Sequence, residues 1–195
     1  MSTTIPKVYF GSILDCHNVA AVVVNPANSF LRHGGGLARV LDQVAQTLPG
    51  YDHIQKCSPE SPQSAIKAVG EYQAWHALGH RVATGDAILG PPGLLPFAAI
   101  IHAVGPIWKD GSVYEAELLH EAYYNASAVA RDAGYTSIVF PAIGAGIFGC
   151  PIDVVAAEAV HASYAFRDIL VTTYAVTDPE HEAAFNKEIQ EIYFD

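Results

Sequence analysis

Residues 22–41 read VVVNPANSFLRHGGGLARVL, and the rest of the chain can be interpreted outward from this stretch. The valine run at its start predicts a buried strand, and the apolar spacing after the glycines is that of one helix face. Gly34–Gly36 lack a Cβ, so the backbone there can adopt positive φ and a ligand can approach closely. A strand, a glycine turn and a helix start together predict an anion site built from backbone N–H groups and the helix dipole.

Two amide side chains, Asn25 and Asn28, come at the end of this strand, the edge where open α/β sheets bind their ligands. The stretch resembles the first ligand loop of a macro domain, the ADP-ribose-binding module, in which Asn-x-x-Asn, a spacer and Gly-Gly-Gly connect a strand to a helix. The sequence His33-Gly34-Gly35-Gly36 is most similar to the corresponding loop in the macro domains of coronaviruses. The resemblance extends from Val8 to about Tyr193.

Composition and length fit one domain over residues 1–195, because a chain of 195 residues with 51% apolar residues can bury a sizeable core. No run of about 18 apolar residues predicts a transmembrane helix, and the N-terminus lacks the form of a signal peptide. Cys16, Cys57 and Cys150 are scattered, which argues against a disulfide framework or a metal site. We therefore expect a cytoplasmic protein, or one of the host cytoplasm if it is viral.

The formal net charge of −10 and the absence of a basic stripe in the sequence argue against a nucleic-acid or membrane partner. One small anion can still bind, because N–H groups in a cleft act locally while salt screens distant charges over roughly 8–10 Å. A monomer is the default expectation.

Apolar strands alternate with amphipathic helices along the chain, which predicts a three-layer α/β/α sandwich around a mostly parallel sheet. Thr84-Gly85-Asp86-Ala87 matches a further macro-domain signature, which opens a strand. His102, in the next apolar run, is expected to be a buried core residue, and a catalytic base is the lesser alternative. A capping box of Ser112 and Glu115 predicts the start of the longest helix. The further predicted elements are strands Lys7–Phe10, Phe97–Val104, Ser137–Ile143 and Ile169–Val176, and helices Ser112–Gly134, one from Pro151, and one capped by Asp178-Pro179.

A second glycine loop, Gly144–Gly149, repeats the arrangement of strand, glycine turn and helix start. It also matches the Gly-x-Gly-x-x-Gly pattern of dinucleotide-binding folds, and Asp178 is a conceivable ribose contact in that alternative. Hydride chemistry on NAD stays the lesser alternative, because the loop comes late in the chain and no catalytic partner set is visible. No Gly-Lys-Ser/Thr occurs, which excludes a Walker loop.

The resemblance also implies roles for individual residues. Asn28 should hold a hydroxyl of the distal ribose, His33 should orient the loop or the ribose, and Phe148 should pack over the distal ribose; these form the candidate catalytic set. Asn25 is expected to brace the turn. The candidate ligand-binding residues are Ser12, Ile13, Asn25, Gly34, Gly35, Gly36, Leu37, Gly144, Ala145, Gly146, Ile147, Phe148 and Thr177.

Four positions depart from the family pattern. Ser12 replaces an Asp that accepts a hydrogen bond from adenine, Gly144 replaces a Ser, and Thr177 lies where an aromatic residue often stacks on adenine. Ala38 replaces an Asp that one cellular branch uses in catalysis, so the Asp-dependent mechanism is excluded.

The activity implied by the resemblance is removal of mono-ADP-ribose from modified protein side chains, by cleavage of an activated anomeric bond. No cofactor or metal is expected, and the partners would be ADP-ribose and mono-ADP-ribosylated proteins. Two alternatives remain: a non-catalytic ADP-ribose reader, and a phosphatase or deacetylase of free derivatives such as the 1″-phosphate or O-acetyl-ADP-ribose.

Overall fold

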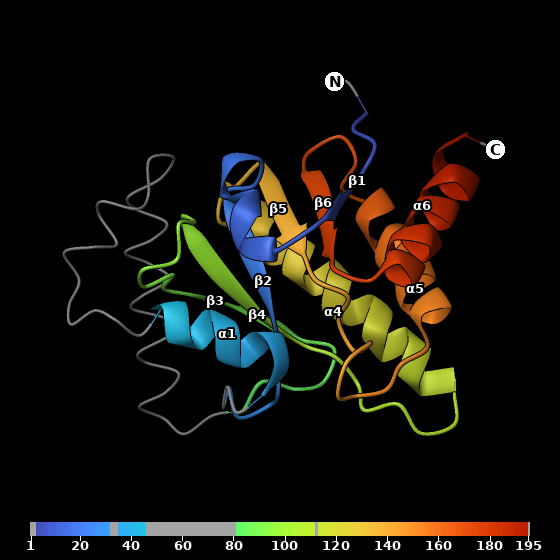
Figure 1. The fold of residues 1–195 in the computed structure, drawn as a ribbon, viewed down its shortest axis with the longest axis horizontal. Helices are drawn as coiled ribbons and strands as arrows, with labels where there is room; N and C mark the ends of the chain where they lie inside the picture. The colour runs from blue at the N-terminus through green and yellow to red at the C-terminus, as the bar shows by residue number, and fades with distance from the viewer. Residues whose placement is uncertain (1–2, 32–34, 46–80, 112, 195) are drawn as a thin grey trace.

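The computed structural model describes residues 3–31, 35–45, 81–111 and 113–194 (Figure 1). His33 and Gly34 of the glycine loop, Ser112 of the predicted capping box and residues 46–80 lie outside these ranges.

A six-stranded sheet forms the centre of the molecule, with the strand order β1-β6-β5-β2-β4-β3. All neighbouring pairs are parallel except β3 with β4. This arrangement confirms the predicted mostly parallel sheet. The strands are β1 (Lys7–Phe10), β2 (Val22–Ala27), β3 (Ala87–Gly90), β4 (Ala99–Val104), β5 (Ser137–Phe140) and β6 (Val171–Val176).

Helices cover both faces of the sheet, as expected for a three-layer sandwich (Figure 1). Alternation along β2 divides the core, because Val22 and Val24 pack on one face while Val23 packs on the other. The first face is covered by α4 (Val113–Asp132), α5 (Ile152–Tyr164) and α6 (Pro179–Phe194). The second face is covered by α1 (Gly36–Ala45) and the short 3₁₀-helix η1 (Ile13–Asn18).

Several element boundaries differ from the sequence prediction for local chemical reasons. The strand predicted over Ser137–Ile143 ends at Phe140, because Pro141 has no N–H to donate to the ladder. The chain after β1 forms a short helix that the sequence did not predict, η1 (Ile13–Asn18), which begins where Ser12 Oγ accepts a hydrogen bond from Leu14 N at 3.3 Å. The strands predicted from Phe97 and Ile169 begin two residues later, at Ala99 and Val171.

The helix ends are held by side-chain and backbone caps. The carboxylate of Glu115 accepts from Lys109 N and Gly111 N, so it orders the loop before α4. Gly134 ends α4 at φ +84°, with the pair of backbone bonds of a Schellman motif. Asp178 Oδ1 accepts from Glu180 N at 2.8 Å and caps α6, as predicted. Pro151 takes the N-cap of α5 instead of its first turn. Within the described ranges, no helix is long and apolar enough to cross a membrane.

Candidate functional site

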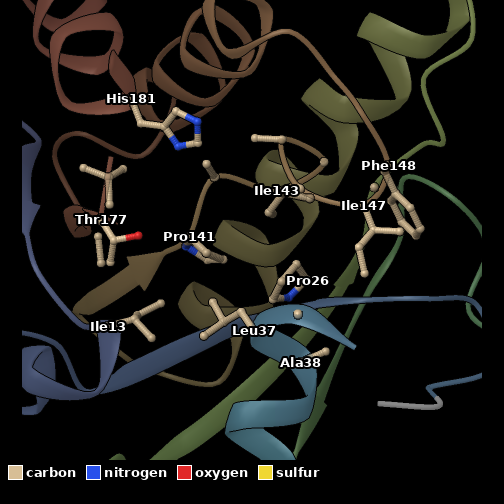
Figure 2. A pocket seen from close by; sticks show the side chains of 18 of the residues that line it. Ile13, Pro26, Leu37, Ala38, Pro141, Ile143, Ile147, Phe148, Thr177 and His181 are labelled. Carbon is tan, nitrogen blue, oxygen red and sulfur yellow. The ribbon is translucent and has the colours of Figure 1, made fainter. Parts of the chain in front are cut away.

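A cavity of about 760 Å³ opens along the carboxyl edge of the sheet (Figure 2). Because β1, β6, β5, β2 and β4 run parallel, the residues that follow them meet at this edge, where α/β sheets bind ligands. The volume is within the range of small-molecule sites. The residues directly after these five strands all line the cavity: Gly11, Thr177, Pro141, Asn28 and Gly105.

Most of the predicted ligand-binding residues are brought together here. The cavity wall contains Ser12, Ile13, Asn28, Gly35, Gly36, Leu37, Gly144, Ala145, Gly146, Ile147, Phe148 and Thr177. Asn25 does not line it, and His33 and Gly34 lie outside the described residues.

The first loop fixes Asn28 through an Asx turn, in which its side-chain Oδ1 accepts from Phe30 N at 3.1 Å. The Asn28 carbonyl also accepts from Leu31 N, so the backbone turns sharply after β2. Gly35 and Gly36 then open α1, whose first N–H groups have no partner within the helix. The result is a helix N-terminus beside an oriented amide, both on the cavity wall.

The second loop is closed by its own backbone bonds: Cys150 N donates to the Gly144 carbonyl, and Gly149 N donates to the Gly146 carbonyl. In the described part of the chain, the N–H groups of Gly146, Ile147 and Phe148 donate to no protein acceptor. Gly144 adopts φ +86°, which favours glycine at this position. Two sets of backbone donors therefore border one cavity, as an anion site requires.

Tyr123 of α4 supports the base of the second loop from within the core. Its hydroxyl donates to the Pro141 carbonyl at 3.1 Å and accepts from Ile143 N at 2.8 Å. Burial raises the pKa of Tyr123 well above its ordinary value, so the hydroxyl keeps its proton. The sequence did not reveal this role, since nothing in the spacing of residues along a helix indicates the partner of a buried hydroxyl.

Asn25 and His102 form a buried pair under the site. Asn25 Nδ2 donates to His102 Nδ1 at 2.9 Å, across the register that joins β2 and β4. Both residues are almost fully buried. Asn25 thus braces the sheet below the cavity, and His102 has the core environment that was expected of it.

The cavity wall is nearly without charge. Within the described residues, its lining contains no carboxylate, lysine or arginine, and His181 is the one ionisable side chain. The acidic residues that the structure describes therefore lie outside the wall. Sequence reasoning missed His181, although its place in the first turn after a strand end was a usable signal.

The described residues contain no group of three His, Cys, Asp or Glu side chains that could hold a metal ion. Cys16 and Cys150 are buried thiols, and burial raises the pKa of each to about 11. Asp178 caps α6 and does not line the cavity, so the dinucleotide alternative lacks its acidic ribose contact.

Comparisons with known proteins agree with this geometry. The macro domain family model matches residues 24–159. An O-acetyl-ADP-ribose deacetylase from Escherichia fergusonii is 34% identical over 172 residues, which cover 88% of this chain and 84% of that protein. A macro domain-containing protein from Listeria monocytogenes is 37% identical over 140 residues, which cover 72% and 69% of the two chains.

Among solved structures, a glycine-to-valine variant of the Oceanobacillus iheyensis macrodomain with ADPR matches with a TM-score of 0.76. It is 25% identical and covers 96% of this chain and 93% of that one. The two relatives described above are bacterial. The comparisons therefore do not support the expected special similarity to the macro domains of coronaviruses. The fold, the site at the strand ends and these matches lead to one conclusion: the chain belongs to the macro domain family.

Proposed function

We propose that the cavity binds ADP-ribose and that the protein hydrolyses an ester on the distal ribose, with O-acetyl-ADP-ribose as the first substrate. The observation that carries this proposal is the pair of glycine loops whose backbone donors border one uncharged cavity. Relatives 34% identical that bear the name O-acetyl-ADP-ribose deacetylase favour a deacetylase over the mono-ADP-ribosyl hydrolase predicted from the sequence.

The diphosphate would lie between the start of α1 and the second loop. There the helix dipole and the N–H groups of Gly146–Phe148 offset its charge. With the diphosphate in the middle, one end of the cavity would hold the distal ribose and the opposite end would hold the adenosine. Asn28 and Phe148 border the end proposed for the distal ribose, and Phe148 is tied toward the β4 edge because its carbonyl accepts from Trp108 N at 2.9 Å. Ile13 and Thr177 border the opposite end, beside β1 and β6 (Figure 2).

In the proposed reaction, the oxygen of a water molecule bonds to the acyl carbon and the bond from that carbon to the ribose oxygen breaks. The proton passes to the ribose oxygen, and acetate and ADP-ribose leave. Backbone N–H groups of the glycine loops are suited to the negative oxygen of the tetrahedral intermediate. With no carboxylate on the described wall, the water would be positioned by the Asn28 amide and by a phosphate oxygen of the substrate itself.

A second candidate is the release of mono-ADP-ribose from a protein, which uses the same pocket with a larger leaving group. The position of Ile147 favours this candidate, because the side chain lines the cavity and is also 81% exposed. A distal ribose placed at such an open wall leaves room for an attached protein side chain.

The test compares acetate release from O-acetyl-ADP-ribose and label release from an auto-mono-ADP-ribosylated protein. Wild type, Asn28→Ala and a matched surface control, Asn186→Ala, are assayed together. Asn28→Ala should lower turnover about 10²-fold or more if the amide acts in the transition state, while the control keeps full activity.

The three other outcomes each point to a different conclusion. Label release without acetate release would favour the second candidate. Calorimetric binding of ADP-ribose without either product would make the protein a reader. Absence of binding would refute the assignment of the cavity itself.

A further inference from the structure

His181 is a cavity-wall residue to which no role has yet been given. It is the third residue of α6 (Pro179–Phe194), is half-buried and lines the cavity. Figure 2 places its ring on the same side as Thr177 and apart from Phe148. Because α6 packs on β1 and β6, His181 belongs to the end proposed for adenosine.

The backbone of His181 is held in place by the cap of its helix. Asp178 Oδ1 accepts from Glu180 N at 2.8 Å, and the Asp178 carbonyl accepts from Glu182 N at 3.0 Å. These two bonds fix the backbone turn that carries His181.

The ring of His181 is not used for the protein's own structure. No hydrogen bond or ion pair joins it to another of the described residues. Two other histidines contrast with it: His102 Nδ1 accepts from Asn25, and His120 Nδ1 lies 3.2 Å from Glu158 Oε2. An imidazole that lines a cavity and serves no internal contact keeps both nitrogens and a ring face for a ligand.

The same end of the cavity is poor in other groups that could recognise a nucleoside. Ser12 Oγ accepts from Leu14 N as the cap of η1, which leaves its O–H donor and one lone pair, and Thr177 offers a hydroxyl but no ring. Within the described lining, the aromatic side chains are Phe148 and His181, and Phe148 borders the other end. Among the described lining residues of this end, His181 is therefore the one with an aromatic face for a base.

We propose that His181 is the residue by which this pocket recognises the adenosine half of its ligand, through contact of the imidazole with the adenine base. The proposal rests on the proposed ADP-ribose site. It assigns to α6 a contact that an acidic residue at position 12 and an aromatic residue at position 177 would otherwise supply.

The test measures the affinity of the full chain for ADP-ribose by calorimetry, and for AMP and ribose 5-phosphate by competition. Wild type is compared with His181→Ala and with His161→Ala, an exposed histidine on α5 that does not line the cavity. His181→Ala should weaken ADP-ribose and AMP by about tenfold or more, the range for losing one contact with a base. Ribose 5-phosphate should bind the variant as it binds wild type, and His161→Ala should match wild type throughout.

Unchanged affinity of His181→Ala for all three ligands would overturn the proposal, as would an equal loss for ribose 5-phosphate, which would assign the ring to the other half. Failure of wild type to bind ADP-ribose would instead refute the proposed function, and the His181 contact with it. A thermal melt of each variant checks folding, and His181→Gln replaces the alanine variant if that variant melts early.

Discussion

Tyr123→Phe removes a single oxygen atom from the core, yet we expect this change to weaken ligand binding at the cavity. The hydroxyl joins α4 to the base of the second glycine loop through two buried hydrogen bonds, with the Pro141 carbonyl and Ile143 N. Tyr174→Phe is a matched control: Tyr174 is equally buried, and its hydroxyl donates to the Ala159 carbonyl at 2.8 Å, within α5.

The two variants should lose different amounts of unfolding free energy, because they leave different buried polar groups without the tyrosine hydroxyl. Tyr123→Phe leaves a buried N–H and a buried carbonyl outside any regular element, which costs about 2–4 kcal/mol of unfolding free energy. Tyr174→Phe leaves a carbonyl in mid-helix that still accepts its helical bond, so the loss is about 1 kcal/mol. For a chain of this size, the melting temperature should fall by roughly 5–15 °C in the first variant and roughly 2–4 °C in the second.

Thermal unfolding and ADP-ribose calorimetry on the same preparations test this reasoning. With its base released, the second loop must be ordered by the ligand, so affinity should fall roughly three- to tenfold in Tyr123→Phe. Tyr174→Phe should bind as wild type. Equal melting temperatures and equal affinities in the two variants would refute the claim that the Tyr123 hydroxyl holds the loop.

Two further predictions concern the loop and the thiols. Gly144→Ala and Gly134→Ala both place a Cβ at positive φ, +86° and +84°, which should cost about 1 kcal/mol in thermal melts for Gly134→Ala. Gly144→Ala should cost more, because its Cβ would lie 3.3 Å from Cys150 Cβ, whereas that of Gly134→Ala meets no atom within 4 Å. Only Gly144→Ala should weaken ADP-ribose, and an equal weakening by Gly134→Ala would contradict the loop assignment. In a Cys57→Ser background, iodoacetamide at pH 8 should label native Cys16 and Cys150 about a hundredfold more slowly than a thiol with the ordinary pKa of 9.0, because burial raises both pKa values to about 11. Rapid labelling of the folded protein would show that one of these thiols is accessible.

The sheet and its helices could be predicted because their signals are local. Runs such as Val22–Val24 and the apolar face of α4 repeat with the period of their element, and Gly134 and Asp178 mark helix ends by their own chemistry. The predicted end of a strand was wrong where a single residue interrupts an apolar run, as at Pro141, which ends β5 at Phe140.

Much of the site was also available from the sequence. Parallel strands bring the residues after their carboxyl ends to one edge, so glycine loops after β2 and β5 had to face a common cavity. That rule grouped Asn28 with Gly146–Phe148 although more than a hundred residues separate them.

The order of the elements, the sheet edge that carries the candidate site and the backbone donors on that edge can therefore be read from the sequence. Three other features depend on how the elements pack: Asn25 turns inward to His102, the Tyr123 hydroxyl holds the second loop, and His181 reaches the cavity wall. The two groups of features differ in the range of the interactions behind them. Periodicity and capping act within a few residues, whereas a hydrogen-bond partner or a wall position depends on which elements pack together.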